Sequence, residues 1–142
     1  MKIEPVVFPS VRAKHTSYVV DFTLDNNITF IQGDSGVGKS AVYSFLEELS
    51  AEDGRIKCYN YLDKSKGYKQ AIRNAKGKLF VIDNADVLLD DRQRGQIALD
   101  EKNQYILFGR NPTGLLLSLD EIYELQSVTE NGITTFTLQK GI

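Results

Sequence analysis

The chain has 142 residues, of which 42% are hydrophobic and 25% charged, with a formal net charge of −2 and one cysteine, Cys58. This composition is typical of a globular protein and argues against intrinsic disorder, a disulfide framework and a general affinity for nucleic acid. The apolar stretches are too short to span a membrane and the N-terminus lacks the pattern of a signal peptide. We therefore expect a single cytoplasmic domain over residues 1–142.

The first elements are predicted to be strands. Residues 1–17 contain two prolines and should form an irregular or edge segment. Residues 18–24 are rich in β-formers, residues 25–27 are typical of a turn, and the apolar residues 28–31 follow as the next strand. We expect these two strands to pair as an antiparallel hairpin.

The next segment contains the pattern G-x-x-x-x-G-K-S/T, the phosphate-binding P-loop, between strand 28–31 and a helix predicted over 41–49. Such a loop directs backbone N–H groups and a helix N-terminus at phosphate oxygens. Its lysine reaches the β- and γ-phosphates, and its last hydroxyl binds Mg²⁺. The predicted nucleotide-binding residues are Gly33, Asp34, Ser35, Gly36, Val37, Gly38, Lys39, Ser40 and Ala41. The alternative is a glycine-rich turn that binds nothing.

A basic and aromatic region follows, with a strand predicted over 55–61 and a surface helix over 64–76. This region either contacts single-stranded nucleic acid or is a solvated helical face, and the sequence favours the solvated face. Its members are Lys57, Tyr59, Tyr61, Lys64, Lys66, Tyr68, Lys69, Arg73, Lys76 and Lys78.

Residues 79–82 form a continuous apolar run, typical of a buried parallel strand, and Asp83 follows at its C-terminal end. Ligands bind at that end of strands in open α/β sheets. We expect Asp83 to hold Mg²⁺ together with Ser40, as a Walker-B aspartate does. The alternative is that Asp83 only caps a turn after a core strand.

The remaining elements are a helix over 90–99, a buried strand over 105–108, and a closing hairpin of 122–128 and 133–139 around Asn131-Gly132. Strands that alternate with helices predict an α/β fold. We therefore expect a doubly wound, mainly parallel sheet of P-loop NTPase topology, with antiparallel hairpins near both ends.

The segment from Lys78 to Leu89 resembles the Walker-B segment of AAA-type ATPases, and residues 105–112 are similar to their sensor-1 strand. Residues 18–31 are instead similar to the antiparallel strands that precede the P-loop of ABC-type ATPases. The resemblance to P-loop NTPases covers residues 17–125. Three features depart from it: Asn84 stands where both families carry glutamate, an AAA-type helical lid is missing, and so is the ABC signature Leu-Ser-Gly-Gly-Gln.

The resemblance implies an ATPase that uses Mg²⁺, in which Lys39 and Asp83 act on the triphosphate and Asn111 or Asn84 positions the attacking water. Arg110, or less favourably Arg94, would stabilise the developing charge, and Asp86 is a substitute for the missing glutamate. The alternative is an ATP-binding switch or interaction module with little hydrolysis; a small-molecule kinase is less favoured. A homo-oligomer or a larger protein complex is expected, and nucleic acid is not indicated as a partner.

Overall fold

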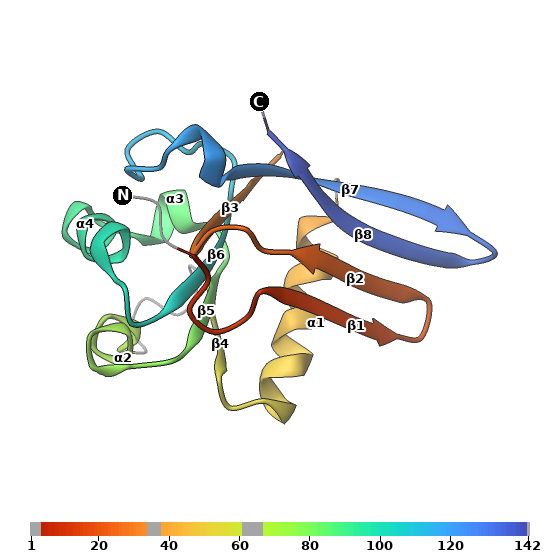
Figure 1. The fold of residues 1–142 in the computed structure, drawn as a ribbon, viewed down its shortest axis with the longest axis horizontal. Helices are drawn as coiled ribbons and strands as arrows, with labels where there is room; N and C mark the ends of the chain where they lie inside the picture. The colour runs from red at the N-terminus through yellow and green to blue at the C-terminus, as the bar shows by residue number, and fades with distance from the viewer. Residues whose placement is uncertain (1–3, 34–37, 61–66, 142) are drawn as a thin grey trace.

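The computed structural model describes residues 4–33, 38–60 and 67–141, and its strands form one sheet (Figure 1). The strands are β1 (Ser10–His15), β2 (Tyr18–Thr23), β3 (Ile28–Gln32), β4 (Ile56–Tyr59), β5 (Leu79–Ile82), β6 (Gln104–Gly109), β7 (Ile122–Glu130) and β8 (Ile133–Lys140). Their order across the sheet is β1-β2-β8-β7-β3-β6-β5-β4. The helices are α1 (Lys39–Glu52), α2 (Tyr68–Asn74), α3 (Ala85–Leu88), α4 (Asp91–Leu99) and the 3-10 turn η2 (Leu119–Glu121).

The predicted doubly wound, mainly parallel sheet of P-loop topology is wrong. The sheet is mixed and curled into a half-barrel, with 38% of residues in strands and 28% in helices. The pairs β1–β2 and β7–β8 are antiparallel, and β2 runs parallel to β8, so that both ends of the chain add to one side of the sheet. Long antiparallel ribbons twist strongly, which accounts for the curl of this side.

The predicted hairpin between residues 18–24 and 28–31 is also wrong, because β2 pairs with β1 and β8 whereas β3 pairs with β6 and β7. Asn26 and Asn27 are buried and bind distant backbone instead of closing a tight turn. Asn26 Nδ2 donates to Asp120 O at 2.6 Å, and Asn27 Nδ2 donates to Asn103 O at 2.7 Å. These hydrogen bonds attach the connection between β2 and β3 to η2 and to the residue that precedes β6.

The closing hairpin is confirmed as β7 and β8. Its turn residues Asn131 and Gly132 have φ values of 52° and 78°. A two-residue turn with positive φ at both positions matches the twist of its strands, which is why Asn-Gly predicts it well. β1 is an edge strand, as expected for the first segment.

Five neighbouring strands, β7, β3, β6, β5 and β4, run parallel to one another. The register pairs Gln32 with Gly109 and Ile82 with Leu107, so the C-terminal ends of β3, β5 and β6 lie at one edge of the sheet. The continuous apolar runs of β5 and β6 are buried throughout, as the pattern predicted.

Two hydrophobic clusters cover opposite faces of the sheet. On one face, Val42 and Leu46 of α1 pack with Ile31, Val81 and Phe108. Helices α2, α3 and α4 gather on the other face in Figure 1, where their side chains join a second cluster. α4 begins at Asp91 because Asp90 caps it: Gln93 N donates to Asp90 Oδ1 at 2.9 Å.

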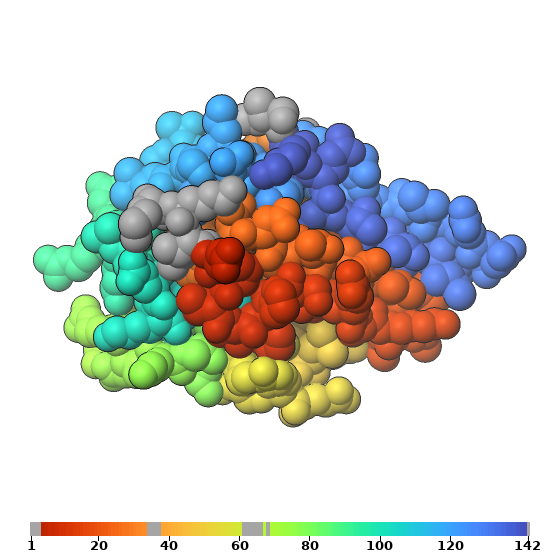
Figure 2. All heavy atoms as spheres, in the orientation of Figure 1, coloured from red at the N-terminus to blue at the C-terminus, as the bar shows by residue number. Residues whose placement is uncertain are grey.

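The N-terminal strands lie beside α1 and the C-terminal hairpin on the face that Figure 2 shows. Tyr18 of β2 stacks on Phe136 of β8, with ring centroids 5.9 Å apart.

Within the described ranges, no helix combines the length and the apolar character that crossing a bilayer requires.

Candidate functional site

The predicted phosphate loop connects the end of β3 to the start of α1. Asp34, Ser35, Gly36 and Val37 lie outside the described residues. Gly33 and Gly38, on either side, have φ values of 152° and 101°. A Cβ at Gly38 would lie 2.7 Å from Cε1 of the Phe136 ring. Glycine is therefore required at position 38 for both its backbone conformation and its close approach to β8.

Lys39 is half-buried and lies across two strand ends. Its Nζ donates to Gly33 O, at the end of β3, and to Gly109 O, at the end of β6, the latter at 3.4 Å. Ser40 and Ala41 follow in the first turn of α1, and both are exposed. The ammonium group thus lies at the edge of the sheet where the parallel strands end.

Asp83 follows β5 at the same edge and is half-buried. Burial raises the pKa of its carboxyl group, against the lowering effects of a hydrogen bond from Asn84 N at 2.9 Å and of the Lys39 charge. The negative charge of Asp86 also raises this pKa. Lys39 contacts the ends of β3 and β6, and Asp83 follows β5, so these two predicted site residues lie at the same edge of the sheet.

Asn84 directly precedes α3 and has the left-handed conformation, with φ 52° and ψ 44°. An amide at this position can orient a water molecule but cannot accept its proton. Positive φ at a residue other than glycine is uncommon and marks a sharp change of chain direction after β5. The conformation explains how Asp83 can end a strand while Asp86, three residues later, turns back toward β6.

Asp86 has a role that the sequence did not indicate. Its Oδ2 accepts hydrogen bonds from Arg110 N at 3.3 Å and from Asn111 N at 3.2 Å. A Cβ at Gly109 would lie 2.8 Å from Asp86 Oδ1. Asp86 therefore holds the backbone after β6, next to the carbonyl that binds Lys39. The one signal in the sequence was Gly109, since a glycine at a strand end indicates close approach by another group.

Arg110 and Asn111 are exposed, and the structure places their backbone beside the site. Asn111 Oδ1 accepts from Thr113 N at 2.9 Å, which stabilises the local turn. Arg94 contacts the backbone of Asp86: its guanidinium donates to Asp86 O at 2.8 Å and to Leu89 O at 2.9 Å. It binds carbonyls at the C-terminal end of α3.

The oxygen donors predicted at this edge are of the chemical type that Mg²⁺ prefers. Among the described residues, no group of three or more His, Cys, Asp or Glu side chains could hold a metal ion by itself. Mg²⁺ is bound in nucleotide sites by one or two protein oxygens, together with phosphates and water. The Asp83 carboxylate and the Ser40 hydroxyl are donors of that kind.

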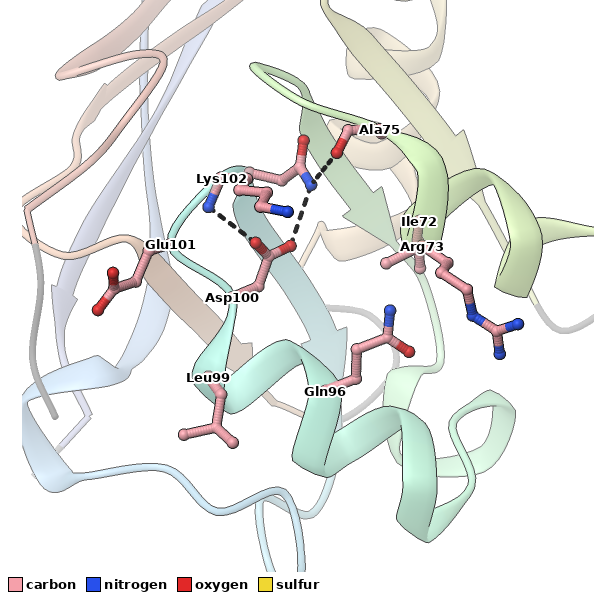
Figure 3. A pocket seen from close by; sticks show the side chains of 9 residues that line it. Ile72, Arg73, Ala75, Gln96, Leu99, Asp100, Glu101 and Lys102 are labelled. Carbon is pink, nitrogen blue, oxygen red and sulfur yellow. Dashed lines mark hydrogen bonds between the residues drawn. The ribbon is translucent and has the colours of Figure 1, made fainter.

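A pocket of about 500 Å³ lies near the opposite edge of the sheet, between α2 and α4 (Figure 3). Asp100 at its rim accepts hydrogen bonds from Lys102 N at 2.8 Å and from Asn103 Nδ2 at 3.0 Å, and a further one from Tyr105 OH. Burial, and then this bond to Asp100, raises the pKa of Tyr105. Because its carboxylate is occupied by internal donors, Asp100 stabilises the loop before β6.

The sequence matches no model of a known protein family, and no curated protein matches it. The candidate site therefore rests on the motif and on the geometry of Lys39, Asp83 and Asp86.

Proposed function

We propose that this protein binds ATP as its Mg²⁺ complex on the loop of residues 33–40 and hydrolyses the γ-phosphate. The observation that carries the proposal is the position of Lys39, the lysine of the phosphate-binding pattern. Its Nζ reaches the carbonyls that end β3 and β6, and its charge acts on Asp83 at the end of β5. A cation and a carboxylate at the ends of adjacent parallel strands are suited to a metal-bound triphosphate.

In the proposed reaction, a water oxygen forms a bond to the γ-phosphorus while the bond from that phosphorus to the β–γ bridging oxygen breaks. ADP leaves with the electron pair, and the proton of the water passes to phosphate or solvent. Lys39 stabilises the charge on the phosphate oxygens, and Asn84 or Asn111 orients the water. Arg110 is exposed beside the site and would add positive charge there. Ser40 and Asp83 would hold Mg²⁺, which when bound offsets further phosphate charge.

A second candidate function, an ATP-binding switch with little hydrolysis, is favoured by the contacts of Asp86. Efficient hydrolysis needs a group that takes or relays the proton of the attacking water. The amide of Asn84 is too weak a base to take this proton. The carboxylate of Asp86 already accepts hydrogen bonds from the backbone N–H groups of Arg110 and Asn111. In this case the bound nucleotide would control assembly with other proteins.

Cytoplasmic location and assembly belong to the same proposal. ATP is abundant in the cytoplasm, and a single free cysteine, Cys58, is compatible with its reducing conditions. An exposed Arg110 could also be offered to the site of a neighbouring copy in a homo-oligomer.

Nucleotide titration and phosphate release test these alternatives. Wild type, Lys39→Ala and the control Lys14→Ala, which alters an exposed lysine of β1, are compared with Mg²⁺–ATP. The ATPase proposal predicts release by wild type and Lys14→Ala, and background release by Lys39→Ala. Binding by wild type with release at background supports the switch instead. If wild type does not bind ATP at millimolar concentration in the presence of Mg²⁺, both proposals are wrong.

A further inference from the structure

The positive charge of this chain is concentrated in one segment. Of the 17 lysine and arginine residues, eight lie between residues 55 and 78, and that stretch contains a single carboxylate, Asp63. The whole chain nevertheless has a formal net charge of −2. The net charge therefore conceals a strong local excess. Lys57 lies on the edge strand β4, and Lys69 and Arg73 lie on the adjacent helix α2 (Figure 1), whereas Lys64 and Lys66 lie outside the described residues.

A hollow of about 220 Å³ lies among β4, β5 and α2 in this region. Tyr59 and Phe80 supply aromatic surface, Lys57 and Lys78 supply two ammonium groups, and Asn74 supplies an amide. None of the described residues that line the hollow carries a carboxylate. An aromatic ring, two cations and an amide are better suited to bind a nucleotide than to bind an apolar peptide.

The ring of Tyr59 is held by a column of buried aromatic side chains. It stacks on Phe80 with ring centroids 6.3 Å apart and an interplanar angle of 26°. Phe80 stacks in turn on Tyr105, at 5.7 Å and 23°. Tyr59 itself is only partly buried. A partly exposed ring that is already ordered can stack on a base with little loss of conformational entropy.

The charges around the hollow remain positive after their internal contacts are considered. Lys57 is exposed. Lys78 Nζ donates to Gly54 O at 3.2 Å and lies near Asp53. The carboxylate of Asp53 is itself paired with Arg55 at 2.7 Å, a hydrogen bond that lowers the Asp53 pKa to about 2. Two cations, Arg55 and Lys78, thus act on the one carboxylate of Asp53, and Lys57 adds a third positive charge on β4.

We propose that this hollow binds single-stranded nucleic acid, with one base on the ring of Tyr59 and neighbouring phosphates at Lys57 and Lys78. A duplex keeps its base faces stacked inside, so it could use the lysines but not the ring. The proposal is independent of the proposed ATP site, although the two are adjacent, since Asp83 N donates to Tyr59 O at 2.8 Å.

The test measures binding of a fluorescein-labelled oligothymidylate to the whole protein by fluorescence anisotropy, at several salt concentrations. Tyr59→Leu should weaken binding about fivefold to a hundredfold, and Tyr59→Phe, which keeps the ring, should bind like wild type. Each lysine that contacts a phosphate contributes about 0.7 to the slope of log K against log salt concentration. The double variant Lys57→Gln/Lys78→Gln should therefore flatten this slope by about 1.4, whereas the control Lys14→Gln should leave it unchanged.

Thermal unfolding of each variant separates loss of binding from loss of the fold. If Tyr59→Leu does not fold, the variant Lys57→Gln, which changes an exposed residue, still tests the proposal through the salt dependence of binding. Lys39→Ala, measured without ATP, should bind the oligonucleotide like wild type, so failure of the ATP proposal would leave this one standing. The proposal is overturned if wild type does not bind at low salt, or if folded Tyr59→Leu binds as tightly as wild type. It is also overturned if a duplex or heparin competes as well as the single strand, which would indicate a general polyanion site.

Discussion

Gly38→Ala is expected to destabilise the protein through a single added methyl group. The new Cβ would lie 2.7 Å from Cε1 and 3.4 Å from Cζ of the Phe136 ring. Carbon atoms are in favourable contact at about 3.5–4.0 Å, so the ring or residue 38 must move by roughly 1 Å. Phe136 is buried and stacks on Tyr18, so a shift of its ring must also displace the contact between these two rings.

Two costs add in this variant. The left-handed conformation of residue 38, with φ 101°, costs a residue other than glycine about 1–2 kcal/mol. Overpacking against a buried ring costs about 1–3 kcal/mol. We therefore expect the free energy of unfolding to fall by about 2–5 kcal/mol and Tm to fall by about 4–20 °C, taking about 2–4 °C per kcal/mol.

Thermal unfolding followed by circular dichroism measures this change. The matched control is Gly95→Ala in α4, where nothing lies within 4 Å of the added Cβ, and which should stabilise the helix by about 0.5–1 kcal/mol. The double variant Gly38→Ala/Phe136→Leu should cost less than the sum of its two single variants, because the shorter side chain relieves the contact. A Tm for Gly38→Ala within about 1 °C of wild type would refute the close approach of Gly38 to Phe136.

Three further predictions follow from the site and the core. Asp86→Ala should lower nucleotide binding and phosphate release, because it frees the backbone of Arg110 and Asn111. Since these two residues are exposed, the free energy of unfolding should change by about 1 kcal/mol or less. Unchanged activity would contradict the positioning role of Asp86. Asp83→Asn should abolish Mg²⁺-dependent nucleotide binding without lowering Tm at neutral pH, because the burial that raises the pKa of Asp83 disfavours its charge; a large drop in Tm would contradict this. Burial raises the pKa of Cys58 to about 12, so the native thiol should react slowly with iodoacetamide at pH 8 and fast in denaturant. Equal reaction rates in native and denatured protein would exclude this burial. Because the pKa of Cys58 is higher in the folded than in the unfolded protein, its contribution to stability should be complete below about pH 8.5 and should decrease as the pH rises toward 12.

Local patterns determined much of this protein. The apolar run at 79–82 predicted β5, and Asn131-Gly132 predicted the closing hairpin, because burial periodicity and turn conformation are properties of neighbouring residues. The pairing of a phosphate-binding pattern with an aspartate after a buried strand likewise predicted that Lys39 and Asp83 share one edge of the sheet. Parallel strands with helical connections end at the same edge, so this much needs no knowledge of strand order.

Only the tertiary structure decided which strands became neighbours. β2 contains the same β-forming residues whether it pairs with β3, as predicted, or with β1 and β8, as observed. The choice depends on contacts remote in sequence, such as those of Asn26 and Asn27, although residues 25–27 are typical of a turn. The anchoring role of Asp86 depends in the same way on the register that brings Gly109 beside it. Periodicity specifies which residues of a strand are buried, but the strand that covers them is selected by the packing of the whole sheet.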